Sequence, residues 1–287
     1  MLPFAAVLTA VLVWGLSFLS IKITVAVFPP MTLALLRFIM ASVLLFGVLK
    51  LREPETKLDF KDLPLFIPAG VIGITLYFFF ENNGVKIITA SAASIIIATI
   101  PILTLVADAL ILKNRLTGKK IISVFLSMIG VCLVVGVDIR WSDSGLGYLM
   151  MLGAAISWVI YTIITKPLFK KYSQLAIVFY QTVIGTIALI PFALLEKTDW
   201  NQVSITIVLN LFFLGVCCSA LGYYVYAYAL DKLGANLSAL FLNFIPVVAV
   251  VASCFILKER LSFLQILGGV IVISAVTIVN WQKKQTI

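Results

Sequence analysis

The sequence predicts an all-α integral membrane protein with ten transmembrane helices, arranged as two inverted repeats of five helices. Three observations support this fold class: an apolar composition, ten apolar runs of membrane-spanning length, and a segment that the chain contains twice. Of the 287 residues, 62% are hydrophobic and 11% are charged, whereas soluble domains are about half apolar and about a quarter charged. A chain of this composition is expected to have lipid as its main solvent.

The apolar runs are separated by turn-forming or polar residues, such as Pro29-Pro30 and Asn83-Gly84. Each run is long enough to cross a bilayer, which takes roughly 20 apolar residues, with shorter runs tolerated. The polar stretch Asp138–Gly145 leaves five runs on each side, which predicts repeats over 1–140 and 145–287. The runs are 3–24, 31–51, 64–83, 88–111, 120–137, 145–166, 174–195, 203–228, 235–257 and 262–281.

The duplicated segment is Ala90–Leu116, which falls on Ala235–Leu261 when the sequence is shifted by 145 positions. Ten of its 27 positions are then identical, including Pro101 on Pro246 and a closing Leu-Lys-x-Arg-Leu. Apolar composition alone does not place a proline and a basic end in register, so the chain is interpreted as an internal duplication.

The basic residues predict the orientation. Fourteen of the 21 lie in gaps or in the tail on the N-terminal side of the membrane, six lie on the other side, and Arg37 lies within a run. Because basic loops favour the cytoplasm, both termini are expected inside, at the cell (inner) membrane. Five helices per repeat then force the second repeat to enter from the opposite side, an inverted arrangement that recurs in secondary transporters.

Other features narrow the function class. The net charge of +9 is explained by these topology signals, so no nucleic-acid partner is expected. The four cysteines lie inside apolar runs and predict no disulfide framework. The apolar run directly after Met1 favours a retained first helix over a cleaved signal peptide. The chain has no histidine, Cys-x-x-Cys or phosphate-binding loop, so no catalytic residue, metal or cofactor is expected.

Several short motifs resemble the EamA branch of the drug/metabolite transporter superfamily: Trp14 in AVLVWGLSFLSIK, Arg37-Phe38, Ala90-Ser91-Ala92 with Pro101, and the paired LKNRL and LKERL ends. The resemblance covers essentially the whole chain. It implies ten helices in two inverted halves, with the fifth and tenth helices peripheral and small metabolites moving through a central cavity. Gln181 stands where Arg37 would repeat, and Val159 where Gly15 would, so the two half-sites are chemically unequal.

The two prolines and the polar side chains near them are candidates for the cavity. Pro101 and Pro246 are expected to kink the middle of their helices and free a backbone carbonyl, which membranes tolerate next to protein or a wet cavity. Ser94 lies seven residues before Pro101, on nearly the same helix face, and Asn243 lies three residues before Pro246. Both are therefore candidates for contact with a substrate. The alternatives are a passive kink and helix–helix hydrogen bonding.

Aromatic and ionisable residues supply the other candidates. Trp14 and Trp158 occupy matching positions at an offset of 144, too deep for an interfacial belt, and Tyr161 follows one turn after Trp158. Their rings suit an apolar, aromatic or cationic substrate, or else pack in the core. Arg37 and Glu81 lie at similar depth, so an ion pair between them could be structural or could couple transport to protons.

Lys22 and Lys86 are rival partners for Glu81, and Asp108 is interpreted as an anchor at the inner surface.

The expected function is export of amino acids or related amphiphilic metabolites by alternating access, with a small molecule and the lipid bilayer as partners and a monomer or homodimer as the assembly. A multidrug or cation exporter and an intramembrane enzyme acting on a lipid-linked substrate are the alternatives. The candidate substrate-binding residues are Trp14, Arg37, Glu81, Ser94, Trp158, Tyr161, Gln181 and Asn243, with Pro101 and Pro246 as helix kinks.

Overall fold

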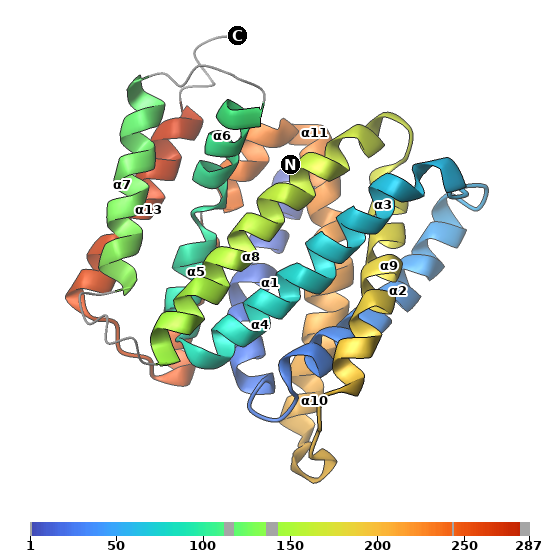
Figure 1. The fold of residues 1–287 in the computed structure, drawn as a ribbon, viewed down its shortest axis with the longest axis horizontal. Helices are drawn as coiled ribbons and strands as arrows, with labels where there is room; N and C mark the ends of the chain where they lie inside the picture. Colours follow the sequence, from blue (N-terminus) through green and yellow to red (C-terminus); the bar gives the residue numbers. More distant parts are fainter. Residues whose placement is uncertain (1, 112–117, 136–142, 243, 282–287) are drawn as a thin grey trace.

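The computed structural model describes residues 2–111, 118–135, 143–242 and 244–281, and no strand occurs among them. The expected all-α class is confirmed (Figure 1). The helices are α1 (Leu2–Thr24), α2 (Pro30–Arg52), α3 (Leu63–Gly70), α4 (Tyr77–Ile87), α5 (Ala90–Ile97), α6 (Ile100–Ile111), α7 (Gly118–Val135), α8 (Asp143–Thr165), α9 (Gln174–Leu194), α10 (Ile205–Phe212), α11 (Gly222–Leu242), α12 (Ile245–Ala252) and α13 (Phe263–Trp281).

Within the described residues, six helical spans are long and apolar enough to cross a membrane, and four shorter apolar helices accompany them. Each of the predicted apolar runs overlaps one of these. The shorter ones are Ala90–Thr104, Ile121–Val134, Ile245–Leu257 and Phe263–Ala275. This is the architecture of a multi-pass membrane protein.

One predicted gap is helical in the structure. The apolar runs predict a helix that ends at residue 228 and another that begins at 235, whereas α11 continues from Gly222 to Leu242. The intervening residues are mostly alanine, leucine, aspartate and lysine, and a single glycine is tolerated in a helix. The next proline, Pro246, comes only after α11 has ended.

The two matching prolines interrupt their helices instead of kinking them. Pro101 is the second residue of α6 and Pro246 is the second residue of α12, so each begins a new helical segment. A proline fits the first turn of a helix because that turn has unpaired N–H groups in any case. Before Pro101, the hydroxyl of Thr99 donates a 2.6 Å hydrogen bond to the carbonyl of Ile96.

Two π-helical segments occur at corresponding places in the halves. Val71–Leu76 joins α3 to α4 and packs on α9, while Phe213–Leu221 joins α10 to α11 and packs on α2. Such widened turns are often found at functional sites. They bring side chains of each half into contact with the other half.

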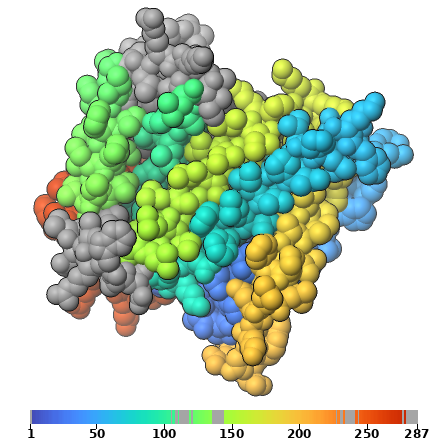
Figure 2. All heavy atoms as spheres, in the orientation of Figure 1, coloured from blue at the N-terminus to red at the C-terminus, as the bar shows by residue number. Residues whose placement is uncertain are grey.

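The halves interleave throughout the molecule. α4 packs against α8, α1 against α11, and α2 against α9. Figure 2 shows α8 and α4 adjoining across one face, with α9 beside α3. Between α2 and α9, the hydroxyls of Ser42 and Thr186 lie 3.3 Å apart. These two positions match at the 144-residue offset.

α7 and α13 form a pair at one edge of the molecule (Figure 1). A Cβ added at Gly268 would lie 2.5 Å from the carbonyl oxygen of Gly130, so the two backbones touch. Small residues permit this close packing of helices in lipid. The pair takes the peripheral position that the resemblance implies for the fifth and tenth helices.

Charged side chains cap helix ends on one side of the bundle. The Glu196 carboxylate accepts the backbone N–H groups of Met31 and Thr32 at the start of α2. Glu259 does the same for Ala90 and Ser91 at the start of α5. Both carboxylates belong to the second half and bind the positive ends of first-half helices, which ties the halves together on this side.

Candidate functional site

An aromatic cluster joins the two halves. The ring of Tyr223 has its centroid 5.4 Å from that of Trp14 in the first half and 6.2 Å from that of Trp158 in the second. The full cluster consists of Trp14, Tyr77, Trp158, Tyr161, Tyr223 and Tyr226. Tyr77 is buried, and the other five side chains are partly exposed.

Two glycines make room for this cluster. A Cβ at Gly73 would lie 2.2 Å from the ring of Tyr161, and one at Gly222 would lie 2.8 Å from the indole nitrogen of Trp14. That nitrogen donates a 3.0 Å hydrogen bond to the carbonyl of Cys218, in the π-helical segment before Gly222. The orientation of Trp14 is therefore set by the opposite half.

Arg37 lies beside the cluster with 3% of its surface exposed. Its Nε donates a 2.9 Å hydrogen bond to the hydroxyl of Ser219 in the second half. Its guanidinium carbon lies 4.6 Å from the centroid of the Phe78 ring, a cation–π contact. One guanidinium nitrogen, Nη1, is buried and has no hydrogen-bond partner.

Glu81 is also buried, and its carboxylate accepts a 2.8 Å hydrogen bond from the hydroxyl of Tyr77. No salt bridge within 4.0 Å joins Glu81 to Arg37, both of which the structure describes. The hypothesised direct ion pair is not formed in this structure. The ammonium group of Lys22 instead donates to the carbonyls of Val85, Lys86 and Ile88 at the end of α4.

Gln181 is buried at the position that matches Arg37 in the second half. Its amide oxygen accepts a 3.0 Å hydrogen bond from Tyr161, and its amide nitrogen donates a 2.9 Å bond to Thr165. The two halves therefore place a satisfied neutral amide and an incompletely satisfied cation at matching positions.

The remaining predicted residues do not join this cluster through any contact in the described chain. Ser94 is buried in α5, where its hydroxyl donates to the carbonyl of Ser91. Asn243 and the side chain of Asp108 lie outside the described residues. Pro101 and Pro246 act at the helix breaks described above.

Four members of the site were not predicted from the sequence: Tyr77, Ser219, Tyr223 and Tyr226. Tyr77 precedes Glu81 by one helical turn, and this spacing could have indicated their contact. Ser219 is a polar residue inside an apolar run, which is a weaker signal. Nothing local distinguishes Tyr223 and Tyr226 from their tyrosine neighbours, because only the packing of α11 on α1 decides which rings face Trp14.

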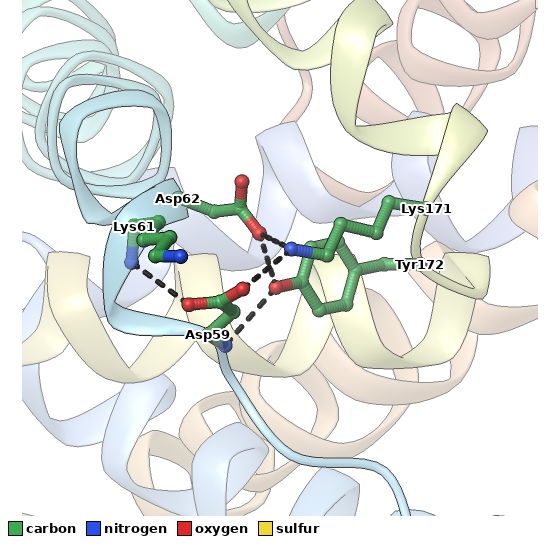
Figure 3. Close-up of polar contacts among 5 residues, drawn as sticks. All are labelled: Asp59, Lys61, Asp62, Lys171 and Tyr172. Carbon is green, nitrogen blue, oxygen red and sulfur yellow. Dashed lines mark hydrogen bonds and ion pairs between the residues drawn. The ribbon is translucent and has the colours of Figure 1, made fainter.

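A network of polar side chains joins the halves beyond the C-terminal end of α2. This loop network consists of Asp59, Asp62, Lys171 and Tyr172 (Figure 3). The Lys171 ammonium lies 2.8 Å from the Asp59 carboxylate and 2.6 Å from that of Asp62. The Tyr172 hydroxyl donates to Asp62 and accepts the backbone N–H of Asp59. The hydrogen bond from Lys171 lowers the pKa of Asp59, and the two carboxylates raise the pKa of Lys171.

The chain matches the model of the EamA-like transporter family twice, over residues 1–136 and 145–281. An uncharacterized transporter of Archaeoglobus fulgidus is 30% identical over 266 residues, which cover 93% of this chain and 94% of that protein. A probable terminal-alkyne amino-acid exporter of Streptantibioticus cattleyicolor is 29% identical over 280 residues, covering 96% and 92%. A solved crystal structure shares the fold with a TM-score of 0.69 at 18% identity, covering 99% of this chain and 98% of that one.

Proposed function

We propose that this chain, which belongs to the EamA-like transporter family, is a secondary transporter that exports small amphiphilic organic metabolites, amino acids among them. The observation that carries the proposal is the ring of Tyr223 packed between Trp14 and Trp158. A site built by both halves can change shape when the halves move against each other, as alternating access requires.

The composition of the site supports amphiphilic substrates. Ligand pockets combine apolar and aromatic walls with a few placed polar groups. Here the aromatic cluster supplies the apolar surface, while the buried side chains of Arg37 and Glu81 supply charges of opposite sign. The name of the Streptantibioticus relative as an amino-acid exporter points to the same substrate class.

The contacts between the halves support an inverted repeat with ten membrane crossings. The pairing of α4 with α8 has its counterpart in α11 with α1, and α2 pairs with its own counterpart α9. The Ser42–Thr186 contact lies where a pseudo-two-fold axis would pass. The loop network on one side and the Glu196 and Glu259 caps on the other are the polar contacts that would loosen in turn during transport.

In the proposed orientation both termini lie in the cytoplasm, at the cell (inner) membrane, as the basic loops favour. Single cysteines in the 113–120 and 138–145 gaps, on a background without the four native cysteines, are expected to react with an impermeant reagent from opposite faces. Reaction of both gaps from the same face would contradict an odd number of crossings per repeat.

The transport proposal is tested with purified protein in proteoliposomes, using radiolabelled amino acids and related amphiphiles. Trp14→Ala and Trp158→Ala are each expected to lower the transport rate by about tenfold or more, because each removes an aromatic ring that positions the substrate. Phe255→Ala is the matched control, because Phe255 is 83% exposed on the outside of the bundle. Equal loss in the control, or full activity in both tryptophan variants, would exclude the aromatic cluster as the site.

The main rival function is export of organic cations, because aromatic rings and the buried Glu81 carboxylate both attract positive charge. The same vesicles distinguish the two functions. Transport of structurally unrelated cations in preference to amino acids would favour the multidrug function.

A further inference from the structure

We infer that Arg37 is the anchor for a carboxylate group of the transported substrate, and this inference rests on the proposed transport function. It narrows the substrate class to small organic carboxylates with an apolar body, of which zwitterionic amino acids fit best. Three observations carry it: the burial of the guanidinium group, its incomplete hydrogen bonding, and the residue at the matching position in the other half.

The guanidinium group is a buried cation without a salt bridge. Arg37 is 3% exposed, and no carboxylate lies within 4.0 Å of it among the described residues. Its polar partner is the neutral hydroxyl of Ser219, and its flat face rests on Phe78. Burying a charge in this way is costly unless a partner compensates it. A bound carboxylate would supply that compensation.

The hydrogen bonding of the group also points to a missing acceptor. Nε is occupied by Ser219, whereas Nη1 is buried and has no partner. Buried donors are almost always satisfied in folded proteins, so an orphan at a candidate site requires an explanation. Carboxylates are the acceptors that the planar guanidinium group binds most strongly, often through two parallel hydrogen bonds.

Packing alone does not require an arginine at this position. The matching residue of the second half is Gln181, which is 1% exposed and hydrogen-bonded at both ends of its amide. A neutral amide therefore fills the equivalent place in the fold with all its main polar contacts made. The charge at Arg37 is the feature that the fold itself does not explain.

The position of Glu81 sets the charge of the best ligand. Its carboxylate accepts a hydrogen bond from Tyr77 on α4, the helix whose Phe78 ring lies against Arg37, and it forms no salt bridge with Arg37. A dianion would be repelled by Glu81, whereas a zwitterion can place its carboxylate at Arg37 and its ammonium group toward Glu81. The site therefore favours α-amino acids over dicarboxylates.

The test uses matched probes in nanodiscs and vesicles: phenylalanine, 3-phenylpropionate and phenethylamine, with leucine, 4-methylpentanoate and isoamylamine as an aliphatic set. Affinity is measured by radioligand binding in nanodiscs, and flux is measured separately in proteoliposomes. In the parent protein, the acids and amino acids are expected to bind at least about tenfold more tightly than the amines.

Arg37→Gln copies the residue of the matching position and is expected to lower the affinity for each carboxylate about 10- to 100-fold, while leaving the amines unchanged. Arg37→Lys keeps the charge but loses the planar group, so its carboxylate affinity is expected to lie between those of the parent protein and Arg37→Gln. Ser219→Ala, which removes the Nε acceptor, is expected to have a smaller effect. Monodisperse elution and an unchanged melting temperature verify that each variant is folded.

Three results would each overturn the inference. They are amines that bind as tightly as the acids, carboxylate affinity that survives Arg37→Gln, and no binding by any carboxylate of the panel. Binding without flux would instead refute the proposed transport and leave the anchor in place. Flux of acids and amines alike would keep the transport function and reject the anchor.

Discussion

The Tyr77 hydroxyl donates a 2.8 Å hydrogen bond to the Glu81 carboxylate, one helical turn further along α4. This contact gives the carboxylate a neutral partner in place of the guanidinium group of Arg37. A buried carboxylate without a salt bridge can exchange a proton during a transport cycle, and ionisable residues at membrane depth are functional candidates by default. Glu81 therefore stays the hypothesised group for coupling transport to a proton gradient.

Glu81→Gln tests this role because it keeps the size and much of the hydrogen bonding of the side chain while removing its titration. Flux driven by a pH gradient is expected to vanish, whereas exchange of labelled for unlabelled substrate is expected to persist. Both are measured in the same proteoliposomes. Tyr77→Phe is the control, since it removes the hydrogen bond but leaves a carboxylate that can titrate. Gradient-driven flux that survives Glu81→Gln intact would exclude Glu81 as the coupling group.

Gly73→Ala and Gly222→Ala test the packing of the aromatic cluster. A methyl group at either position would meet Tyr161 or Trp14 at less than ordinary contact distance, 2.2 and 2.8 Å from the nearest atoms. Overpacking of this kind costs about 1–3 kcal/mol, so a lower melting temperature and a transport rate reduced by about tenfold are expected. The control is Gly47→Ala, which meets nothing within 4 Å. Parent-like transport in both test variants would indicate that the two rings do not shape the substrate site.

Pro101→Ala and Pro246→Ala test the helix breaks. Each substitution restores a backbone N–H donor and allows the interrupted helix to continue across the break. The transport rate, normalised to the amount of protein in the membrane, is expected to fall while that amount stays near the parent value. Pro191→Ala is the control, since Pro191 lies inside α9 on the exposed surface. If both variants transport like the parent, the breaks are architectural, and Ser94 and Asn243 lose their main support as site residues.

Lys171→Gln tests whether the loop network holds one side of the molecule closed. The variant is expected to speed hydrogen exchange in the 53–62 and 166–173 segments, because contacts between the halves are lost there. Lys61→Gln is the control, since only the backbone N–H of Lys61 contacts Asp59. Unchanged exchange in Lys171→Gln would show that the network does not hold the two loops together.

The loop network also carries a prediction about pH. The pKa of Asp59 is lowered from 3.8, so the contribution of Asp59 to the stability of the folded protein is lost only as the pH falls through that lowered value. The pKa of Lys171 is raised from 10.5, so the contribution of Lys171 to the stability of the folded protein is lost only as the pH rises above the ordinary pKa of lysine. Between about pH 5 and 8 the network stays charged, and the pH profile of transport in Lys171→Gln is expected to have the parent shape. A shifted optimum would contradict this assignment.

The sequence by itself determined the helical membrane class, the positions of the apolar runs and the family. These properties depend on composition, period and length, which are local and need no knowledge of which helix touches which. Arg37, Glu81, Trp14 and Trp158 could be selected in the same way, because charge or aromatic area at membrane depth is unusual wherever it occurs.

The tertiary structure alone decided the partners of these residues. Whether Arg37 contacts Glu81 or Ser219 depends on the packing of α2 on a π-helical segment some 180 residues away in the chain, and the ion pair hypothesised from equal depth is not formed in this structure. The same holds for Tyr223 and Tyr226, which became part of the site because α11 packs on α1 and turns these two tyrosines toward Trp14. Depth in a membrane is a property of one helix, whereas contact is a property of two, and side-chain direction at a helix–helix interface is fixed only when both are in place.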